Sequence, residues 1–413
     1  MILISNKPII SHLVFLFSII ITTLSIIPAL FPILYSSVGR TSIITTVDKF
    51  EINVNPFEPG LYFIPIIVTG IIVLVISIII KFKSIKLRSI DISKKYSYIS
   101  LIIILATFTV LSYENLNSAE LYRDWQGMQP GLNAWPSGEM KFEHHVNLFL
   151  LLSSFAIFGN YKVIPFLSSL ILIVATYLIA NKMTNNRMSG LIASVIVLQS
   201  NLFLTFSTSA SYPTFWILFY LISLLVILHK TWFLSPITYI VAIFSKILII
   251  AYFPITLFFI LNAKISIKKK IILSASFIIL IAAGSSLNLT YIGIEWDKIL
   301  NGFISFSYQM RFDGLIIVFL IPIVTGLYLI SKNNQYANTV SIMISWSLIS
   351  SPLLLALTEV STQPYRWIPL VVFCAIGAAM ILTNQKNEPK QVSKKKPKQV
   401  SKKKPKQVSK KSR

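Results

Sequence analysis

Long apolar stretches recur along the chain from Ile9 to Leu382 and are separated by short polar segments. A helix rises about 1.5 Å per residue, so about 20 apolar residues cross the roughly 30 Å hydrocarbon core of a membrane. This pattern predicts an all-α polytopic membrane protein with about twelve transmembrane helices. The expected spans are residues 9–36, 61–80, 98–113, 163–181, 190–207, 211–229, 233–245, 248–262, 271–288, 314–331, 338–357 and 368–384.

Composition agrees with a membrane solvent, because 55% of the 413 residues are hydrophobic and only 12% are charged. A soluble domain typically carries about a quarter charged residues. The net charge of +23 is concentrated at the C-terminus, where residues 386–413 hold thirteen Lys or Arg and repeat Pro-Lys-Gln-Val-Ser-Lys-Lys. We expect this polybasic tail to be disordered and to contact anionic lipid of the cytoplasmic leaflet; nucleic-acid binding is not expected.

The other basic residues set the expected orientation, because short cytoplasmic loops are enriched in Lys and Arg. Residues 81–95 hold six of them, and residues 264–270 hold four more. Both groups become cytoplasmic if the apolar residues 146–158, too few to span, form an interfacial helix. Both termini then face the cytosol, and residues 114–162 form one long loop on the non-cytoplasmic side, with the plasma membrane as the default location.

The long outer loop opens with three carboxylates, Glu114, Glu120 and Asp124. A carboxylate near a span end can act as a general base towards an acceptor hydroxyl, or can help to hold a divalent cation. Asp124, which stands beside Arg123 and Trp125, is the first choice for the base. The competing interpretation of each carboxylate is an ordinary solvated loop residue.

Farther along the loop, Glu143 is a candidate second acid, and His145 could hydrogen-bond a phosphate or a sugar hydroxyl. His144 and His145 are adjacent, and adjacent side chains on a helix point about 100° apart. A shared zinc site is therefore not expected.

Two regions offer cations for phosphate binding. Arg366 stands between Tyr365 and Trp367 at the mouth of the last expected span, where it could bind phosphate or anchor the helix at the interface. Lys246 lies between two unusually short apolar segments, which marks either a substrate pathway or a side chain that reaches for the interface.

The order of these parts over residues 98–382 resembles the GT-C superfamily of membrane glycosyltransferases, which includes protein O-mannosyltransferases and lipid A aminoarabinose transferases. The shared parts are a span, an outer loop that opens with acids, a flat helix that closes on Phe158-Gly159, a second span and a basic turn. The Phe-Ser-Lys-Ile turn around Lys246 and the Tyr-Arg-Trp-Ile-Pro run around Arg366 also resemble family features. The usual Asp-Glu pair after the first span is absent.

The resemblance implies a sugar donor carried on a polyisoprenyl phosphate, such as dolichyl or polyprenyl phosphate, and an acceptor protein, lipid or glycan. It also implies an inverting reaction with an acidic general base, while Arg366 and Lys246 stabilise the departing phosphate. The expected organisation is a two-span region over residues 1–97, a GT-C-like core over 98–385 and the tail over 386–413. A transporter or lipid flippase, and a non-catalytic membrane assembly subunit, remain alternatives.

Overall fold

The computed structural model describes residues 7–30, 68, 71–72, 75, 91–120, 123–133, 145–229, 231–285, 296–358 and 364–383. Every regular element within these residues is a helix, which confirms the expected all-α class. Four helices are long and apolar enough to cross a membrane, at Pro8–Ala29, Lys94–Asn117, Val163–Thr184 and Pro364–Leu382. These four helices support the expected membrane protein, while the count of twelve spans stays a prediction. Most of the expected second span, Glu143 and the polybasic tail lie outside the described residues.

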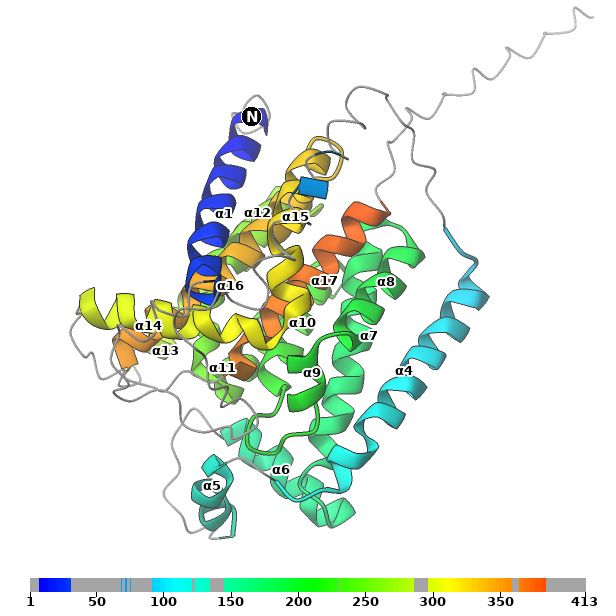
Figure 1. The fold of residues 1–413 in the computed structure, drawn as a ribbon, viewed down its shortest axis with the longest axis vertical. Coiled ribbons are helices and arrows are strands. Elements are labelled where there is room, and N and C mark those ends of the chain that lie inside the picture. Colours follow the sequence, from blue (N-terminus) through cyan, green and yellow to red (C-terminus); the bar gives the residue numbers. More distant parts are fainter. Residues whose placement is uncertain are drawn as a thin grey trace, which may run out of the picture.

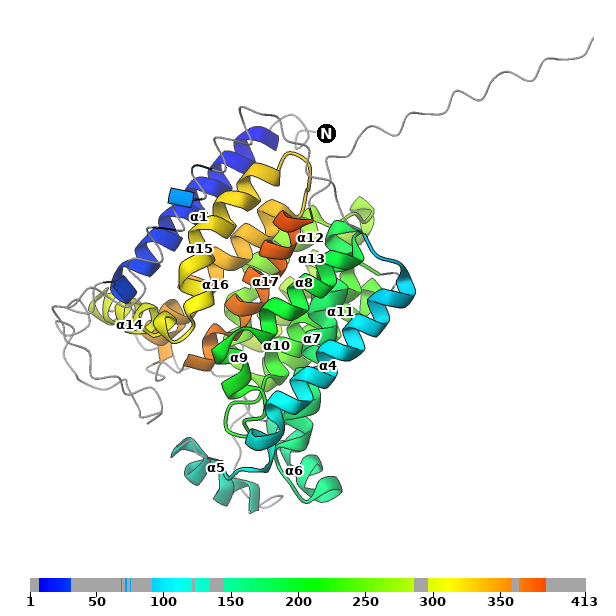
Figure 2. The same cartoon turned by 45° about the vertical axis from the view of Figure 1, so that its right-hand side comes forward.

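The long helices form one bundle, in which α17 is central and α4 and α1 lie on opposite sides (Figures 1 and 2). The helices of the bundle are α1 (Lys7–Leu30), α4 (Lys94–Asn117), α7 (Val163–Thr184), α8 (Arg187–Leu198), α10 (Phe215–Ile227), α15 (Gly314–Ile330), α16 (Ala337–Thr358) and α17 (Ile368–Leu382). Because α17 is uninterruptedly apolar and includes small residues, neighbours pack on all its sides and bury it almost completely. Most of α4, by contrast, is exposed.

Particular residues explain how the bundle closes. A Cβ atom on Gly190 of α8 would lie 2.7 Å from the backbone oxygen of Tyr177 on α7, so only glycine permits this close approach. Phe108 anchors α4, because its ring is fully buried 5.5 Å from the ring of Phe166 on α7. On the other side of the bundle, α1 meets α16 through a hydrogen bond between the hydroxyls of Ser341 and Ser18, in the manner of small polar contacts between membrane helices.

Several shorter elements interrupt the expected spans. The stretch expected over 190–207 is two helices, α8 and α9 (Asn201–Phe206), because the Ser200 side chain caps the second by accepting from the Phe203 amide. The segment around Lys246 consists of α11 (Ser235–Ser245), η4 (Ile247–Tyr252) and α12 (Phe253–Asn262), with Lys246 itself extended. The remaining elements are η3 (Trp232–Leu234), α13 (Ile267–Ser285), α14 (Trp296–Tyr308) and η5 (Gln309–Phe312).

One end of the bundle carries the first part of the long loop. Here α5 (Arg123–Asn133) and α6 (His145–Phe158) lie beyond the last turn of α4 (Figures 1 and 2). The short helix expected over 146–158 is therefore present as α6, which ends at Gly159 with a φ of 67°. A small apolar cluster joins the two helices to the chain after α9, since Leu132, Leu151 and Ala210 are buried together. The short η6 (Pro364–Trp367) leads into α17 and packs against α9.

Candidate active site

Glu120 is a candidate carboxylate whose side chain is partly buried and hydrogen-bonded in the structure. Three residues after α4 ends, its side chain accepts hydrogen bonds from the Ala210 amide at 2.8 Å and from the Ser209 hydroxyl at 3.3 Å. Burial raises the pKa of Glu120 above its usual value, while the hydrogen bond from Ala210 and the charge of Lys162 act in the opposite direction. A carboxylate with a raised pKa, hydrogen-bonded in place, suits a general base that works near neutral pH.

Lys162 fixes the chain that leads to Glu120. Its ammonium is buried and donates to the carbonyl oxygens of Asn115 and Ser118, each at 2.9 Å, and of Ala119 at 3.2 Å. The last carbonyls of a helix have no partner within the helix, so a cation at this position satisfies them and favours the negative end of the helix dipole. The exit of α4 is therefore held directly against the start of α7.

The loop formed by residues 207–214 connects Glu120 to a second group of residues. It is tied to α7, because Ser169 donates to the Ser207 carbonyl at 2.7 Å and its hydroxyl lies 3.0 Å from that of Thr214. Tyr212 in this loop stacks on Tyr365 of η6, with ring centroids 4.5 Å apart and ring planes 16° apart. The same loop therefore holds the carboxylate through Ser209 and Ala210 and packs on η6 through Tyr212.

We call Lys246, Tyr365 and Arg366 the cation cluster. The Lys246 ammonium lies 4.9 Å from the centroid of the Tyr365 ring, a cation–π contact. Arg366 is only 4% exposed, and its Nε and Nη1 atoms have no hydrogen-bond partner among the residues that the structure describes. Burying a cation without a partner costs several kcal/mol, roughly, unless an anion compensates it. The unpaired N–H groups therefore favour an anionic ligand.

A break between two helices positions Lys246. Its backbone has φ −160° and ψ 120°, so the chain is extended between α11 and η4. Asn147 on α6 donates from its side-chain amide to the carbonyl oxygen of Ser245 at 2.9 Å, which satisfies one of the free carbonyls at the end of α11. Through this bond the short helix α6 supports the residue immediately before the lysine.

The structure brings Lys246, Tyr365 and Arg366 together and links Glu120 to them through the 207–214 loop. Two of the other candidates have described side chains. Glu114 is exposed in the last turn of α4, and His145 is exposed at the start of α6. Asp124 lies in the first turn of α5, where the position of its side chain is outside the description, and Glu143 lies outside the described residues.

Four further residues that build this site were not singled out from the sequence: Asn147, Lys162, Ser209 and Tyr212. Of these, only Lys162 offered a signal, because few other basic residues occur in the outer loop that it ends. Within the described residues, no group of three or more His, Cys, Asp or Glu side chains is arranged to hold a metal ion.

Comparisons with protein-family models, with curated proteins and with solved structures returned no match. The function therefore has to be inferred from the chemistry of the residues at this site.

Proposed function

We propose that the protein is a membrane glycosyltransferase that moves a sugar from a polyisoprenyl-phosphate donor to an acceptor at the non-cytoplasmic face. The observation that carries the proposal is the linkage, through the 207–214 loop, of a half-buried carboxylate, Glu120, to a buried cation, Arg366, whose Nε and Nη1 atoms have no hydrogen-bond partner among the described residues. Lipid-phosphate glycosyl transfer needs this pair of opposite charges, since a proton leaves the acceptor while negative charge develops on the donor phosphate.

One short loop carries the contacts to both charged groups. Ala210, which donates to Glu120, and Tyr212, which stacks on Tyr365 next to Arg366, are two residues apart in the chain. Within the described residues no ion pair joins Glu120 to Lys246 or Arg366. The same loop therefore holds an acid and cations that do not neutralise each other, as a base and a phosphate site of one reaction require.

Each residue of the site then has a defined role. Glu120 removes the proton from the acceptor hydroxyl, and the acceptor oxygen forms a bond to the anomeric carbon from the face opposite the phosphate. The bond between the anomeric carbon and the phosphate oxygen breaks, its electron pair stays on the lipid phosphate, and the configuration inverts. Arg366 binds the phosphate oxygens through Nε and Nη1, and Lys246 adds a second positive charge.

The proposed topology agrees with this assignment. About twelve spans, with both termini in the cytosol, place Glu120, α6 and η6 together at the non-cytoplasmic surface of the plasma membrane. The interfacial α6 supports Lys246 from the membrane surface through Asn147. The lipid part of the donor stays in the bilayer, and the acceptor approaches from outside.

The test is sugar transfer from radiolabelled polyprenyl-phosphate hexose by the purified full-length protein in lipid. Glu120→Gln, Asp124→Asn and Glu114→Gln are compared with wild type, and Glu58→Gln is the matched control because it removes a carboxylate from a segment distant in sequence. We expect Glu120→Gln alone to abolish transfer while donor binding is retained. If Asp124→Asn abolishes transfer instead, the base is Asp124 on α5.

Two outcomes would contradict the proposal itself. If wild type transfers no sugar from a panel of lipid-phosphate donors but moves lipid or solute across the bilayer, the protein is a flippase or transporter. If it does neither and copurifies with a catalytic partner that needs it for activity, it is an assembly subunit.

A further inference from the structure

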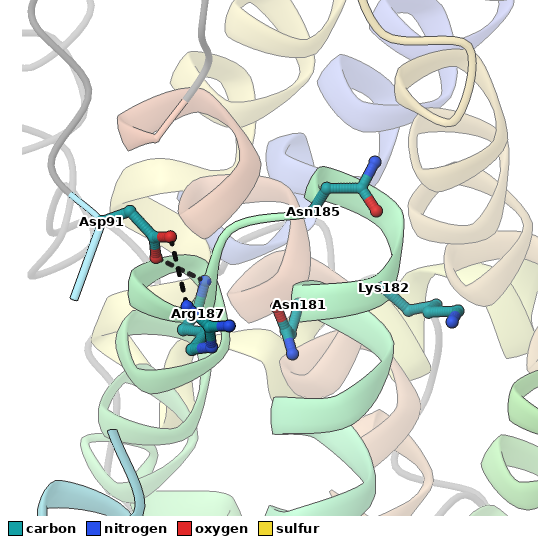
Figure 3. A pocket seen from close by; sticks show the side chains of 5 residues that line it. All are labelled: Asp91, Asn181, Lys182, Asn185 and Arg187. Carbon is teal, nitrogen blue, oxygen red and sulfur yellow. Dashed lines mark hydrogen bonds and ion pairs between the residues drawn. The ribbon is translucent and has the colours of Figure 1, made fainter. Parts of the chain in front are cut away.

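A second polar site lies at the opposite end of the bundle from Glu120. It is a pocket of about 250 Å³ between the start of α4 and the turn from α7 to α8, shown in Figure 3. The pocket is lined by Asp91, Asn181, Lys182, Asn185 and Arg187. Because α4 has 24 residues and leads from this pocket towards Glu120, about 36 Å of helix separates the two sites. The pocket is therefore distinct from the candidate active site.

The pocket combines two cations with one carboxylate. Asp91 accepts a hydrogen bond from the Arg187 amide at 3.1 Å, and its other oxygen lies 3.5 Å from the Arg187 guanidinium. Arg187 also donates to the Ile92 carbonyl at 3.2 Å. The Lys182 ammonium has no hydrogen bond or ion pair with any residue that the structure describes. The lining therefore carries a net charge of about +1, one of its cations being unpaired.

The lining of the pocket carries several hydrogen-bond donors. Lys182 offers three N–H donors, and Asn181 and Asn185 add primary amides. Asn185 adopts the left-handed conformation, with φ 54° and ψ 32°, which turns the chain sharply between α7 and α8. Two backbone amides in the first turn of α8 already donate within the protein, that of Arg187 to Asp91 and that of Met188 to the side chain of Asn186.

Exposed apolar surface lies beside the pocket. On α4, Ile99 and Ile102 are 43% and 65% exposed within two to three turns of Asp91. On the adjoining α7, Ile171 and Leu178 also have exposed side chains. A basic polar pocket next to apolar helix surface fits a phospholipid, whose headgroup enters the pocket while its acyl chains lie along α4 and α7.

We propose that this pocket binds the phosphodiester headgroup of an anionic phospholipid at the end of the bundle opposite the candidate active site. A phosphodiester carries one negative charge, which matches the net charge of the lining. Lys182 and the two asparagines contact the phosphate oxygens, while Arg187 stays positioned by Asp91. The proposal is independent of the glycosyltransferase activity and of the polybasic tail.

The experiment measures phosphatidylglycerol binding to the full-length protein, by native mass spectrometry, with phosphatidylcholine as the reference lipid. The pocket variant is Lys182→Gln with Arg187→Gln. The matched control is Lys95→Gln with Lys332→Gln, which removes the same charge from exposed residues outside the lining. We expect affinity to fall roughly tenfold or more in the pocket variant and less than about threefold in the control. Equal losses would overturn the proposal.

Two additional arms keep the result interpretable. Lys182→Gln alone leaves the Asp91–Arg187 pair intact, so a loss of binding in this variant cannot be attributed to disturbance of that pair. Competition with inorganic phosphate distinguishes the source of the ligand, because a lipid held also by its chains resists displacement. If phosphate displaces the lipid at comparable concentrations, the pocket is a soluble-phosphate site and the lipid assignment is wrong.

Discussion

Charged side chains differ in exposure and in pairing between the two ends of the bundle. At the pocket end, Asp91 and Arg187 form an ion pair whose side chains are 42% and 40% exposed. At the other end, Arg366 is 4% exposed with two nitrogen atoms that lack a hydrogen-bond partner among the described residues, and Glu120 accepts hydrogen bonds from Ser209 and Ala210 in the 207–214 loop. Asp91 and Arg187 are therefore paired and solvent-exposed at one end, whereas Glu120 and Arg366 at the other end are less exposed and form no ion pair with each other among the described residues.

This difference bears on the stability of the fold. An exposed ion pair contributes about 0 to 1 kcal/mol, so the Asp91–Arg187 pair adds little to stability, whatever it contributes to lipid binding at the pocket. A buried unpaired cation lowers stability, so its presence indicates that a ligand compensates it. The predictions below test whether the two ends differ in this way.

The largest effect is expected for Glu120→Gln, which preserves size and one hydrogen-bond acceptor but cannot take a proton at neutral pH. Removal of a general base lowers kcat by roughly 10²- to 10⁴-fold. Steady-state transfer assays would show this loss with little change in KM. The control Glu58→Gln should transfer at the wild-type rate, and an equal loss there would point to a general defect in the purified protein.

Next in size is Arg366→Gln. Hydrogen bonds to charged groups contribute about 1.5 to 3 kcal/mol, so donor affinity should fall roughly 10- to 150-fold. Thermal stability without ligand should be unchanged or higher, because the variant removes a buried charge two of whose nitrogen atoms have no hydrogen-bond partner among the described residues. A variant that binds donor normally but unfolds at lower temperature would identify Arg366 as a structural residue.

A smaller, directional effect is expected for Lys162→Met. The positive charge of Lys162 lowers the pKa of Glu120, so its removal should raise that pKa further. Activity requires the deprotonated base and is lost as pH falls through the pKa, so the acid limb of the pH–rate profile should move to higher pH. Lys162→Arg retains the charge and should restore the profile. An unchanged acid limb in Lys162→Met would exclude coupling between the two groups.

The smallest effect is expected for Arg187→Gln at the pocket end. The exposed pair with Asp91 should cost less than about 1 kcal/mol of stability when it is broken. Thermal unfolding in detergent at low and high salt provides the measurement, and the small difference should shrink further in high salt because the pair is screened. A loss of several kcal/mol would mean that the two ends do not differ as described.

Apolar periodicity predicted the helices of this fold with useful accuracy. The span expected over 163–181 is α7, Val163–Thr184, and the short helix expected over 146–158 is α6, His145–Phe158. Such helices can be predicted because a continuous apolar run in a membrane satisfies its backbone hydrogen bonds internally only as a helix. The break between α8 and α9 was not predicted, because Ser200 caps a helix through a local hydrogen bond that leaves hydropathy almost unchanged.

The candidate site was only partly predictable for a related reason. Arg366 and Lys246 stand out because cations are rare in apolar surroundings. The sequence could not predict that Glu120 is held in place, since this depends on two hydrogen bonds from residues about 90 positions away. Ser209 and Tyr212 carry no charge, and their roles depend on tertiary contacts that no local pattern encodes.

The most direct test is a single-turnover assay in lipid that measures donor binding and sugar transfer separately for Glu120→Gln and Arg366→Gln. If Glu120 is the base and Arg366 is the phosphate-binding cation of one site, Glu120→Gln will bind donor without transferring the sugar. Arg366→Gln will bind donor weakly and, at saturating donor, will transfer sugar measurably but more slowly than wild type, because charge on the departing phosphate is less stabilised. Normal transfer in both variants, or equal loss of donor binding in both, would contradict a shared catalytic site.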